Sequence, residues 1–537
     1  MSQPWLKSYP AGVAPTIDAA PFPSLVHMLD DALQRHAARP AVAGMGRATS
    51  FAELDLTSRR FAAWLQSQGV AKGDRVAVML PNVTPFAVAV VGTLRAGGVL
   101  VTVNPLYTPR ELAHQLKDSG AETLVVFESF AATVAQALEG SPVKRVVVVG
   151  TGLAGMQPVP LPGQVPFLQT LQAGALVPLR PVELQGSDLA FLQYTGGTTG
   201  VSKGAMLRHA NVVANVAQIG EWMSPTLPPD WLPGKNFATF LPLYHIFALT
   251  FCLLYGLRNG MQNILVANPR DLPGAVRELG GQPIHVFPGV NTLFGGLAQH
   301  KPLLDAINLK ELRLCVGGGT AVQQGVAERW AAATGVAICE GYGLSETSPV
   351  ASVNLPTARA FSGTIGLPVP NTEFAIRDDE GRDVPVGERG EICIRGPQVM
   401  AGYWQRPDET ARAMTADGYF KSGDVGVMDE SGFVRIVDRK KDMILVSGFN
   451  VFPNEIEDVV STLPGVAESA AIGVPDEKSG EAVKLFVVRS DPALTVQQVS
   501  AHCRANLTGY KNPRHIEFIE ALPKSTVGKV LRRELRA

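Results

Sequence analysis

The sequence predicts an α/β protein with a large N-terminal domain of helix-covered, mostly parallel sheets, a β-rich subdomain, and a small mobile C-terminal α+β domain. The first observation behind this prediction is that short apolar runs alternate with amphipathic stretches, which is typical of a parallel sheet covered by helices. The second is a change near residue 372, where polar and apolar residues alternate around Gly and Asp turns. The third is that a fresh set of helices and strands follows a charged run at 438–442.

The first alternating block begins at residue 73 with a short apolar run. Each run in this block is bounded by Gly or Pro, residues that interrupt regular structure. We therefore expect strand, helix, strand, helix and strand at "DRVAVML", "PFAVAVVGTLRAG", "VLVTVN", "RELAHQLKDSG" and "TLVVF".

The same alternation returns after residue 186, where the strand candidates end in Gly-rich or polar loops. Ligands of open α/β sheets bind at those carboxyl ends, so these loops are the first place to look for a site. The candidates are "LAFLQYT", "NFATFL", "IHVFPG", "LRLCVGGG" and "VAICEGYGL".

The C-terminal third changes from alternating strands and helices to hairpins and then to a separate unit. "TEFAIRDDEGRDVPVGERGEICIRG" predicts paired strands, and the chain after the charged run predicts helix, strand, strand, helix and strand. The predicted boundaries are therefore a large domain at 1–437, a linker at 438–441 and a small domain at 442–537; the family resemblance described below makes this linker a hinge.

Composition excludes several classes of protein. The 537 residues are 46% hydrophobic, which is ample for large buried cores, and the formal net charge of -1 indicates no nucleic-acid partner. The five cysteines form no C-x-x-C pair, which argues against a zinc site or a disulfide framework and suits a reducing compartment. The N-terminal stretch is broken by prolines and lacks the apolar core of a secretion signal. These features predict a cytoplasmic location.

One uncharged segment, 237–257, is long enough to cross a bilayer. Pro242 and His245 lie near its middle, and a strand-like start precedes a helix-like second half. We therefore predict a buried strand–turn–helix, which would also suit the wall of an apolar ligand tunnel. A membrane span is the alternative.

The stretch "YTGGTTGVSKGAML", residues 194–207, predicts a loop for an anion with several oxygens. Glycines let backbone N–H groups turn toward such a ligand, hydroxyls add donors, and Lys203 adds a positive charge. The nucleotide-hydrolase P-loop has a Ser or Thr directly after its lysine, whereas Gly204 stands there in this chain. A plain Gly/Thr-rich turn is the alternative.

Four further stretches stand out: "VGGGT" (316–320), "GYGLSETSP" (341–349), "SGDVG" (422–426) and "PKSTVGKVLRREL" (523–535). Each has an ordinary structural explanation. The glycines suit a strand-to-helix turn, Glu346 a helix start, Asp424 a turn, and Lys529 a solvated tail.

Together with the phosphate-type loop, these stretches resemble the adenylate-forming superfamily of acyl-CoA synthetases, luciferase-like enzymes and adenylation domains. Within it the chain is most similar to bacterial long-chain fatty acid CoA ligases, over nearly its whole length. The most specific part is the 25-residue run "DGYFKSGDVGVMDESGFVRIVDRKK", 417–441. The chain departs from the family at "FKSGD", where His-Thr commonly precedes Gly-Asp, and at Gly197, where many relatives have serine.

The resemblance implies two half-reactions. A fatty carboxylate attacks the α-phosphate of ATP to give acyl-AMP and pyrophosphate, and the thiol of CoA then displaces AMP. Both reactants of the first step are anions, so concentrated positive charge is required, from Mg²⁺ and lysine. By similarity, Thr195 and Glu346 would lie near Mg²⁺ and Lys203 would face the pyrophosphate. The implied phosphate loop comprises Thr195, Gly196, Gly197, Thr198, Thr199, Gly200 and Lys203.

The resemblance also implies a nucleoside site. Asp424 would accept hydrogen bonds from both ribose hydroxyls, with Arg439 reinforcing it. Tyr342 would offer a stacking face to adenine, beside backbone that passes flat against the base. The glycines implied there are Gly317, Gly318, Gly319, Gly341 and Gly343.

His245 in "LPLYHIF" is either a core histidine or, as in the family, a residue that positions the carboxylate and acts with Thr195, Glu346 and Lys529 in catalysis. Its apolar neighbours would then line a tunnel, which an acyl tail requires because each buried CH₂ contributes about 0.8 kcal/mol. The implied tunnel residues are Tyr244, His245, Phe247 and Leu249.

The family uses one site for both half-reactions by rotating the small domain, and the signature places the hinge at Lys441. In one orientation Lys529 would act on adenylation by charge, since the reference pKa of a lysine side chain is about 10.4 and the group should be protonated at neutral pH. In the other, the loop of Ser447, Gly448, Phe449 and Asn450 would approach the CoA thiol.

Three alternatives stay open at this stage. One is a CoA ligase for medium-chain or aryl, cinnamic-type acids. Another is a fatty-acid carrier anchored in a membrane by 237–257. The third is a protein that binds ATP without turnover. The expected partners are a long-chain fatty acid, ATP and CoA, with peripheral contact to the inner face of the cell membrane and a homodimer as further possibilities.

Overall fold

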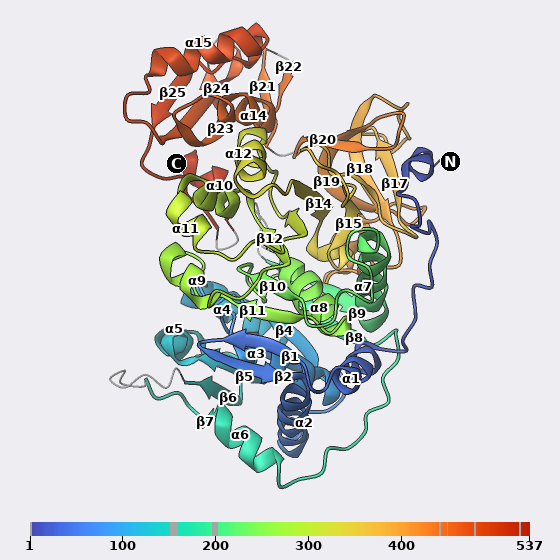
Figure 1. Cartoon of the computed structure of the whole chain (residues 1–537). Helices are drawn as coiled ribbons and strands as arrows, with labels where there is room; N and C mark the ends of the chain where they lie inside the picture. Colours follow the sequence, from blue (N-terminus) through green and yellow to red (C-terminus); the bar gives the residue numbers. More distant parts are fainter. Residues whose placement is uncertain are drawn as a thin grey trace.

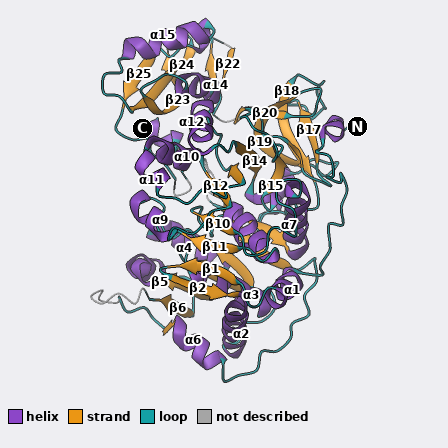
Figure 2. Ribbon diagram, in the orientation of Figure 1, coloured by secondary structure: helices purple, strands orange, loops and turns teal. Residues whose placement is uncertain are grey.

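A computed structural model describes residues 3–150, 159–195, 202–439, 442–447, 449–476, 479–525 and 528–536. The two large sheets and their helices build the lower and middle part of the molecule, and the small domain lies above them (Figure 1). Helices cover the outer faces of the sheets, as the colouring by secondary structure shows (Figure 2). The predicted α/β class, the β-rich subdomain and the small α+β domain are all confirmed.

The first sheet runs in the order β7-β6-β5-β3-β4-β8-β9, and every neighbouring pair is parallel except β8–β9. Its strands are β3 (Arg75–Met79), β4 (Val99–Thr102), β5 (Thr123–Phe127), β6 (Arg145–Val149), β7 (Gln164–Pro166), β8 (Leu189–Thr195) and β9 (Lys203–Arg208). Its connecting helices are α3 (Thr84–Arg95), α4 (Pro109–Ser119), α5 (Ala131–Ala137) and α6 (Phe167–Gly174).

The second sheet runs in the order β16-β15-β14-β13-β12-β10-β11-β1-β2 and is parallel from β14 to β1. Its strands are β1 (Pro40–Gly44), β2 (Arg47–Ser50), β10 (Asn236–Thr239), β11 (Gln262–Leu265), β12 (Val286–Gly289), β13 (Leu314–Gly317), β14 (Ile338–Gly343), β15 (Val350–Val353) and β16 (Leu367–Pro368). The helices around it are α1 (Leu25–Arg35), α2 (Phe51–Ser67), α7 (His209–Met223), α8 (Tyr255–Arg258), α9 (Leu272–Glu278), α10 (Asn291–Gln299), α11 (Lys301–Asp305) and α12 (Gln324–Thr334).

The predicted hairpin region forms an antiparallel sheet in the order β17-β18-β19-β20. Its elements are β17 (Glu373–Arg377), β18 (Arg389–Arg395), α13 (Pro407–Ala413), β19 (Phe420–Met428) and β20 (Val434–Arg439). The small domain has a sheet of its own in the order β22-β21-β24-β23, with β25 parallel to β24. Its elements are β21 (Ile444–Val446), β22 (Phe449–Val451), α14 (Pro453–Ser461), β23 (Val466–Asp476), β24 (Gly480–Arg489), α15 (Val496–Asn506), β25 (His515–Phe518) and α16 (Arg532–Leu535).

Local sequence signals fix the ends of several elements. At α4, the Thr108 hydroxyl accepts from the Glu111 N–H and the Glu111 carboxylate accepts from the Thr108 N–H, which satisfies two unpaired donors of the first turn. The same helix ends at Gly120, whose φ of 65° is the left-handed conformation that glycine adopts without steric cost. Such caps explain why the sequence places this helix correctly.

The uncharged segment 237–257 is a buried strand–turn–helix, as predicted. It comprises β10, a turn at Pro242, a π-helix at Ala248–Leu254 and α8. The side chains of the π-helix are all buried in the large core. Within the part of the chain that the structure describes, no helix is both long and apolar enough to cross a membrane.

Candidate active site

The phosphate-type loop connects two paired strands. Thr195, the last residue of β8, lies opposite Lys203, the first residue of β9, in an antiparallel ladder. The Lys203 ammonium contacts the Glu409 carboxylate at 2.5 Å and lies 5.2 Å from the centre of the Tyr403 ring. The predicted loop residues between the strands lie outside the described residues: Gly196, Gly197, Thr198, Thr199 and Gly200. The predicted loop therefore connects two neighbouring antiparallel strands.

Glu346 lies in a single 3₁₀ turn, Ser345–Thr347, that directly follows β14. The side chain is buried, and the Tyr403 hydroxyl donates a hydrogen bond of 2.7 Å to one of its carboxylate oxygens. A backbone hydrogen bond of 2.8 Å from the Met400 N–H to the Glu346 carbonyl connects the turn to the segment before α13. A carboxylate held in this way is suited to a hard cation.

Magnesium commonly binds through one or two carboxylates together with substrate phosphates. Among the described residues no group of three or more His, Cys, Asp or Glu side chains is placed to hold a metal ion. The buried Glu346 carboxylate is consequently the kind of donor that fits a magnesium ion arriving with a nucleotide.

The predicted nucleoside residues converge at the carboxyl ends of β13 and β14. Gly317 ends β13, Gly318 and Gly319 follow it, and Gly341 and Gly343 belong to β14. A side chain at Gly343 would overlap the backbone carbonyl of Pro349, and a Cβ at Gly318 would lie 3.1 Å from the Phe247 ring and from the Gly341 carbonyl oxygen. Backbone packing therefore requires glycine at Gly343, whereas a side chain at Gly318 would need its neighbours to shift slightly.

Tyr342 and Asp424 come from different sheets and meet in the site. The Tyr342 hydroxyl donates to the Asp424 carboxylate at 2.7 Å, and both side chains are buried. Asp424 lies in β19, where its backbone pairs in register with Arg439 of β20. The structure thus brings together the pair predicted for ribose and adenine, while the Arg439 side chain lies outside what the structure describes.

His245 follows β10 and lies where the segment turns toward the π-helix. Its Nδ1 accepts a hydrogen bond of 3.3 Å from the Phe247 N–H. Burial, and then the charge of Lys529, lower the pKa of His245 to about 4. The imidazole is therefore neutral at pH 7, and Lys529 lies near enough for its charge to act on it.

Lys529 is carried by a short hairpin at the end of the small domain, where Lys524 and Val530 form an isolated bridge. The neighbouring Gly528 packs closely against the large domain. A Cβ at this position would lie 2.8 Å from the Thr292 Oγ1 and 3.1 Å from a methyl group of Val290. The hairpin of the small domain therefore contacts the large domain and places Lys529 near His245.

The apolar residues predicted for the tunnel surround His245. Phe247 stacks on Phe251 with ring centres 6.0 Å apart, and Leu249 is fully buried. The Tyr244 carbonyl accepts from the Gln193 side chain at 3.1 Å. Phe247 lies beside Gly318, so the residues predicted for the tunnel adjoin those predicted for the nucleoside.

The described residues of the predicted CoA-side loop lie in the small domain. Lys441 and Gly448 are outside the described residues. The Ser447 N–H donates to the Ser479 carbonyl at 2.7 Å, and the backbone of Asn450 is part of β22. The exposed Phe449 ring stacks on Tyr510 with centres 4.6 Å apart. In this orientation these contacts lie within the small domain.

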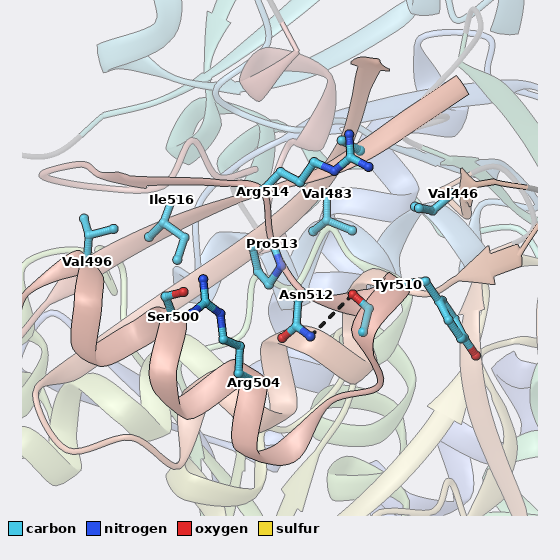
Figure 3. A pocket seen from close by; sticks show the side chains of 12 residues that line it. Val446, Val483, Val496, Ser500, Arg504, Tyr510, Asn512, Pro513, Arg514 and Ile516 are labelled. Carbon is cyan, nitrogen blue, oxygen red and sulfur yellow. Dashed lines mark hydrogen bonds between the residues drawn. The ribbon is translucent and has the colours of Figure 1, made fainter. Parts of the chain in front are cut away.

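A cavity of about 360 Å³ lies beside this loop in the small domain. Figure 3 shows Ser500 and Arg504 of α15 on one side of it, with Val483 and Arg514 toward the other. None of the residues predicted for ATP or fatty acid lines this cavity. It is therefore separate from the site described above.

The segment around α13 supplies contacts that the sequence did not predict. Tyr403 contacts Glu346, and both Tyr403 and Glu409 contact Lys203. The only signal was the mixed aromatic and charged run "GYWQRPDET", which is equally typical of an exposed turn. Its partners are distant in the sequence, so no local pattern could identify them.

Family models match most of the chain. The model for the AMP-binding enzyme covers residues 29–404, and that for the AMP-binding enzyme C-terminal domain covers residues 455–529. The chain therefore belongs to the AMP-binding enzyme family, which confirms the adenylate-forming resemblance.

Relatives and solved structures match the chain over nearly its full length. A long-chain-fatty-acid–CoA ligase of Escherichia coli O6:H1 is 50% identical over 100% of this chain and 98% of its own. 4-coumarate–CoA ligase 5 of Oryza sativa subsp. japonica is 33% identical over 92% of this chain and 90% of its own. The ATP-bound structure of MatB from Rhodopseudomonas palustris superposes with a TM-score of 0.83 at 30% identity, covering 95% of this chain and 98% of that one.

Proposed function

We propose that this protein is an AMP-forming CoA ligase that activates long-chain fatty acids through an acyl-adenylate. The observation that carries the proposal is the packing of the Lys529 hairpin on the large domain, where Gly528 lies against Thr292 and Val290. This packing sets a cation of the small domain near His245 and its apolar neighbours. The full-length identity of 50% to the Escherichia coli ligase supports the choice of acid.

In the first half-reaction a carboxylate oxygen of the fatty acid attacks the α-phosphorus of ATP, and the bond to pyrophosphate breaks. Lys203 and Lys529 supply positive charge as negative charge develops on the phosphate oxygens. His245, neutral at pH 7, offers the fatty carboxylate a hydrogen bond. Magnesium held by Glu346 and the phosphates would supply further charge stabilisation.

The nucleoside is held by groups that do not react. Asp424, already oriented by the Tyr342 hydroxyl, accepts from the ribose hydroxyls, and the backbone at Gly317–Gly319 lies against adenine. In the second half-reaction the sulfur of CoA attacks the acyl carbon, the bond to AMP breaks, and the thiol proton leaves to solvent. The products are acyl-CoA and AMP.

We extend the proposal to domain motion. A large domain at 1–437 and a small domain at 442–537 would change orientation at the 438–441 linker, with Lys441 as the hinge. One orientation presents Lys529 for adenylation, and the other presents the 447–450 loop to CoA. A cytoplasmic location, peripheral contact with the inner face of the cell membrane and a homodimer are further parts of the proposal.

A panel of acids tests the substrate. Pyrophosphate release is measured with acetate, octanoate, palmitate, oleate and 4-coumarate at fixed ATP and magnesium. We expect palmitate or oleate to exceed acetate in kcat/KM by orders of magnitude, because the tail supplies binding energy that acetate lacks. A preference for 4-coumarate or for octanoate would assign the protein to the aryl or medium-chain alternative instead.

A further inference from the structure

The segment from Met400 to Thr410 contacts both β9, which begins at Lys203, and the turn that carries Glu346. Its backbone pairs with β9, because the Met206 N–H donates to the Gly402 carbonyl at 2.9 Å and the Trp404 N–H donates to the Gly204 carbonyl at 2.8 Å. Its first residue holds the turn of Glu346 through the Met400 N–H. Tyr403 thus has a position fixed from two directions.

The Tyr403 side chain contacts two groups of the proposed chemistry. Its hydroxyl donates to the Glu346 carboxylate at 2.7 Å, and its ring face lies under the Lys203 ammonium at 5.2 Å. An ionised carboxylate can only accept, so the Tyr403 hydroxyl is the donor in this bond. One rigid side chain therefore fixes the distance between an anionic group and a cationic one.

Glu409 completes the arrangement at the first turn of α13. Its carboxylate accepts from Lys203 at 2.5 Å, and this bond is the main cause that lowers the pKa of Glu409. Lys203 consequently lies between a carboxylate and an aromatic face, each of which attracts an ammonium group. The lysine is held at the mouth of the hairpin instead of extending into solvent.

We propose that Tyr403 is a positioning residue for the phosphate side of the reaction. Its hydroxyl orients the Glu346 carboxylate toward magnesium, and its ring, together with Glu409, holds Lys203 at the pyrophosphate side. The inference rests on the function proposed above. It adds a residue that touches neither the acid nor the nucleoside and acts through the two groups that do face the phosphates.

The test is the substitution Tyr403→Phe, which keeps the ring under Lys203 and removes only the hydroxyl. Groups that orient a metal ligand typically contribute about 10- to 100-fold to metal affinity. We expect the magnesium concentration for half-maximal pyrophosphate release to rise at least about tenfold, with the KM for the fatty acid unchanged. In calorimetry, the tightening of ATP binding that magnesium produces should shrink by a similar factor.

Tyr419→Phe is the matched control, because Tyr419 repeats the same contacts away from the site. Its hydroxyl donates to Glu373 at 2.9 Å, and the guanidinium of Arg395 lies 4.5 Å from its ring centre. This variant should leave both magnesium measurements at the wild-type values.

Two outcomes would overturn the inference and are distinct from failure of the proposed function. If Tyr403→Phe binds ATP with the wild-type response to magnesium, Tyr403 does not orient Glu346. If Tyr403→Phe and Tyr419→Phe lose stability and activity in parallel, the role is structural only. By contrast, a wild-type protein that binds ATP with magnesium but activates no fatty acid would refute the function and leave the role of Tyr403 intact.

Discussion

The large domain and the small domain contribute to the site in different ways. In the large domain the largest apolar core extends from Trp5 to Val434 and includes Tyr342 and Val316 of the proposed nucleoside site and Leu243 and Ile246 beside His245. The cores of the small domain lie wholly between Ile444 and Leu535 and share no residue with it. The site residues of the large domain are therefore held in place by the packing of that domain. Lys529 belongs instead to the small domain, which has cores of its own.

Among the described residues, the two domains meet at several separate places. Helix α12 packs on α14, where Gly325 lies against the backbone of Ser461. Arg389 lies over the Phe452 ring at 5.6 Å, and the hairpin of Gly528 reaches Val290 and Thr292. Such an interface can separate without disturbing either core, which suits a domain that changes orientation.

The largest effects are expected from the site residues of the large domain. Glu346→Gln and Asp424→Asn should each lower acyl-CoA formation on the order of a hundredfold, because each removes a directed contact to the metal or the ribose. Formation of acyl-CoA from fatty acid, ATP and CoA is the measurement, and Glu373→Gln in the β-rich subdomain is the control. Near wild-type rates in either variant would contradict the assigned role.

Lys529→Ala should slow the first half-reaction and leave the second nearly unchanged. We expect adenylation, measured as pyrophosphate release, to fall roughly thirtyfold, since one cation is lost from the developing charge. CoA transfer from synthetic acyl-AMP should stay near the wild-type rate, because in that step the small domain presents the 447–450 loop to the site instead of Lys529. Equal losses in the two assays would show that Lys529 serves both steps.

Gly325→Ala should have a smaller effect that isolates the domain contact itself. A methyl group there would overlap the Ser461 carbonyl, so the orientation described here would be disfavoured by about 1–3 kcal/mol. Adenylation should fall about tenfold and CoA transfer from acyl-AMP should not change. Gly509→Ala is the control, because a Cβ at Gly509 would meet no atom within 4 Å. If both half-reactions of Gly325→Ala match the wild type, this contact does not define the adenylation orientation.

The sequence predicts the fold well where signals are local. The capping residues Thr108 and Glu111 mark the start of α4, and the short apolar runs coincide with the buried strands of both large sheets. The segment at 237–257 was correctly predicted to begin as a strand and end as a helix. In each case the residues that determine the structure lie within a few positions of one another.

The site is less accessible to such reasoning, because its contacts join distant parts of the chain. The ion pair of Lys203 and Glu409 spans 206 positions, and the bond between Tyr403 and Glu346 spans 57. Lys203 and Glu346 could be nominated from their motifs, but Tyr403 and Glu409 belong to an ordinary polar run. Only the pairing of that run with β9 makes them neighbours.

All five cysteines are buried, and this has a practical consequence for handling the protein. Burial raises the pKa of each thiol, to about 11 even at Cys503. The thiolate is the reactive form, so the native chain is expected to resist disulfide-exchange dyes that react with free CoA at once. A colorimetric thiol titration can then follow consumption of the cosubstrate without a protein background. Later colour development in the same cuvette would report unfolding of the chain.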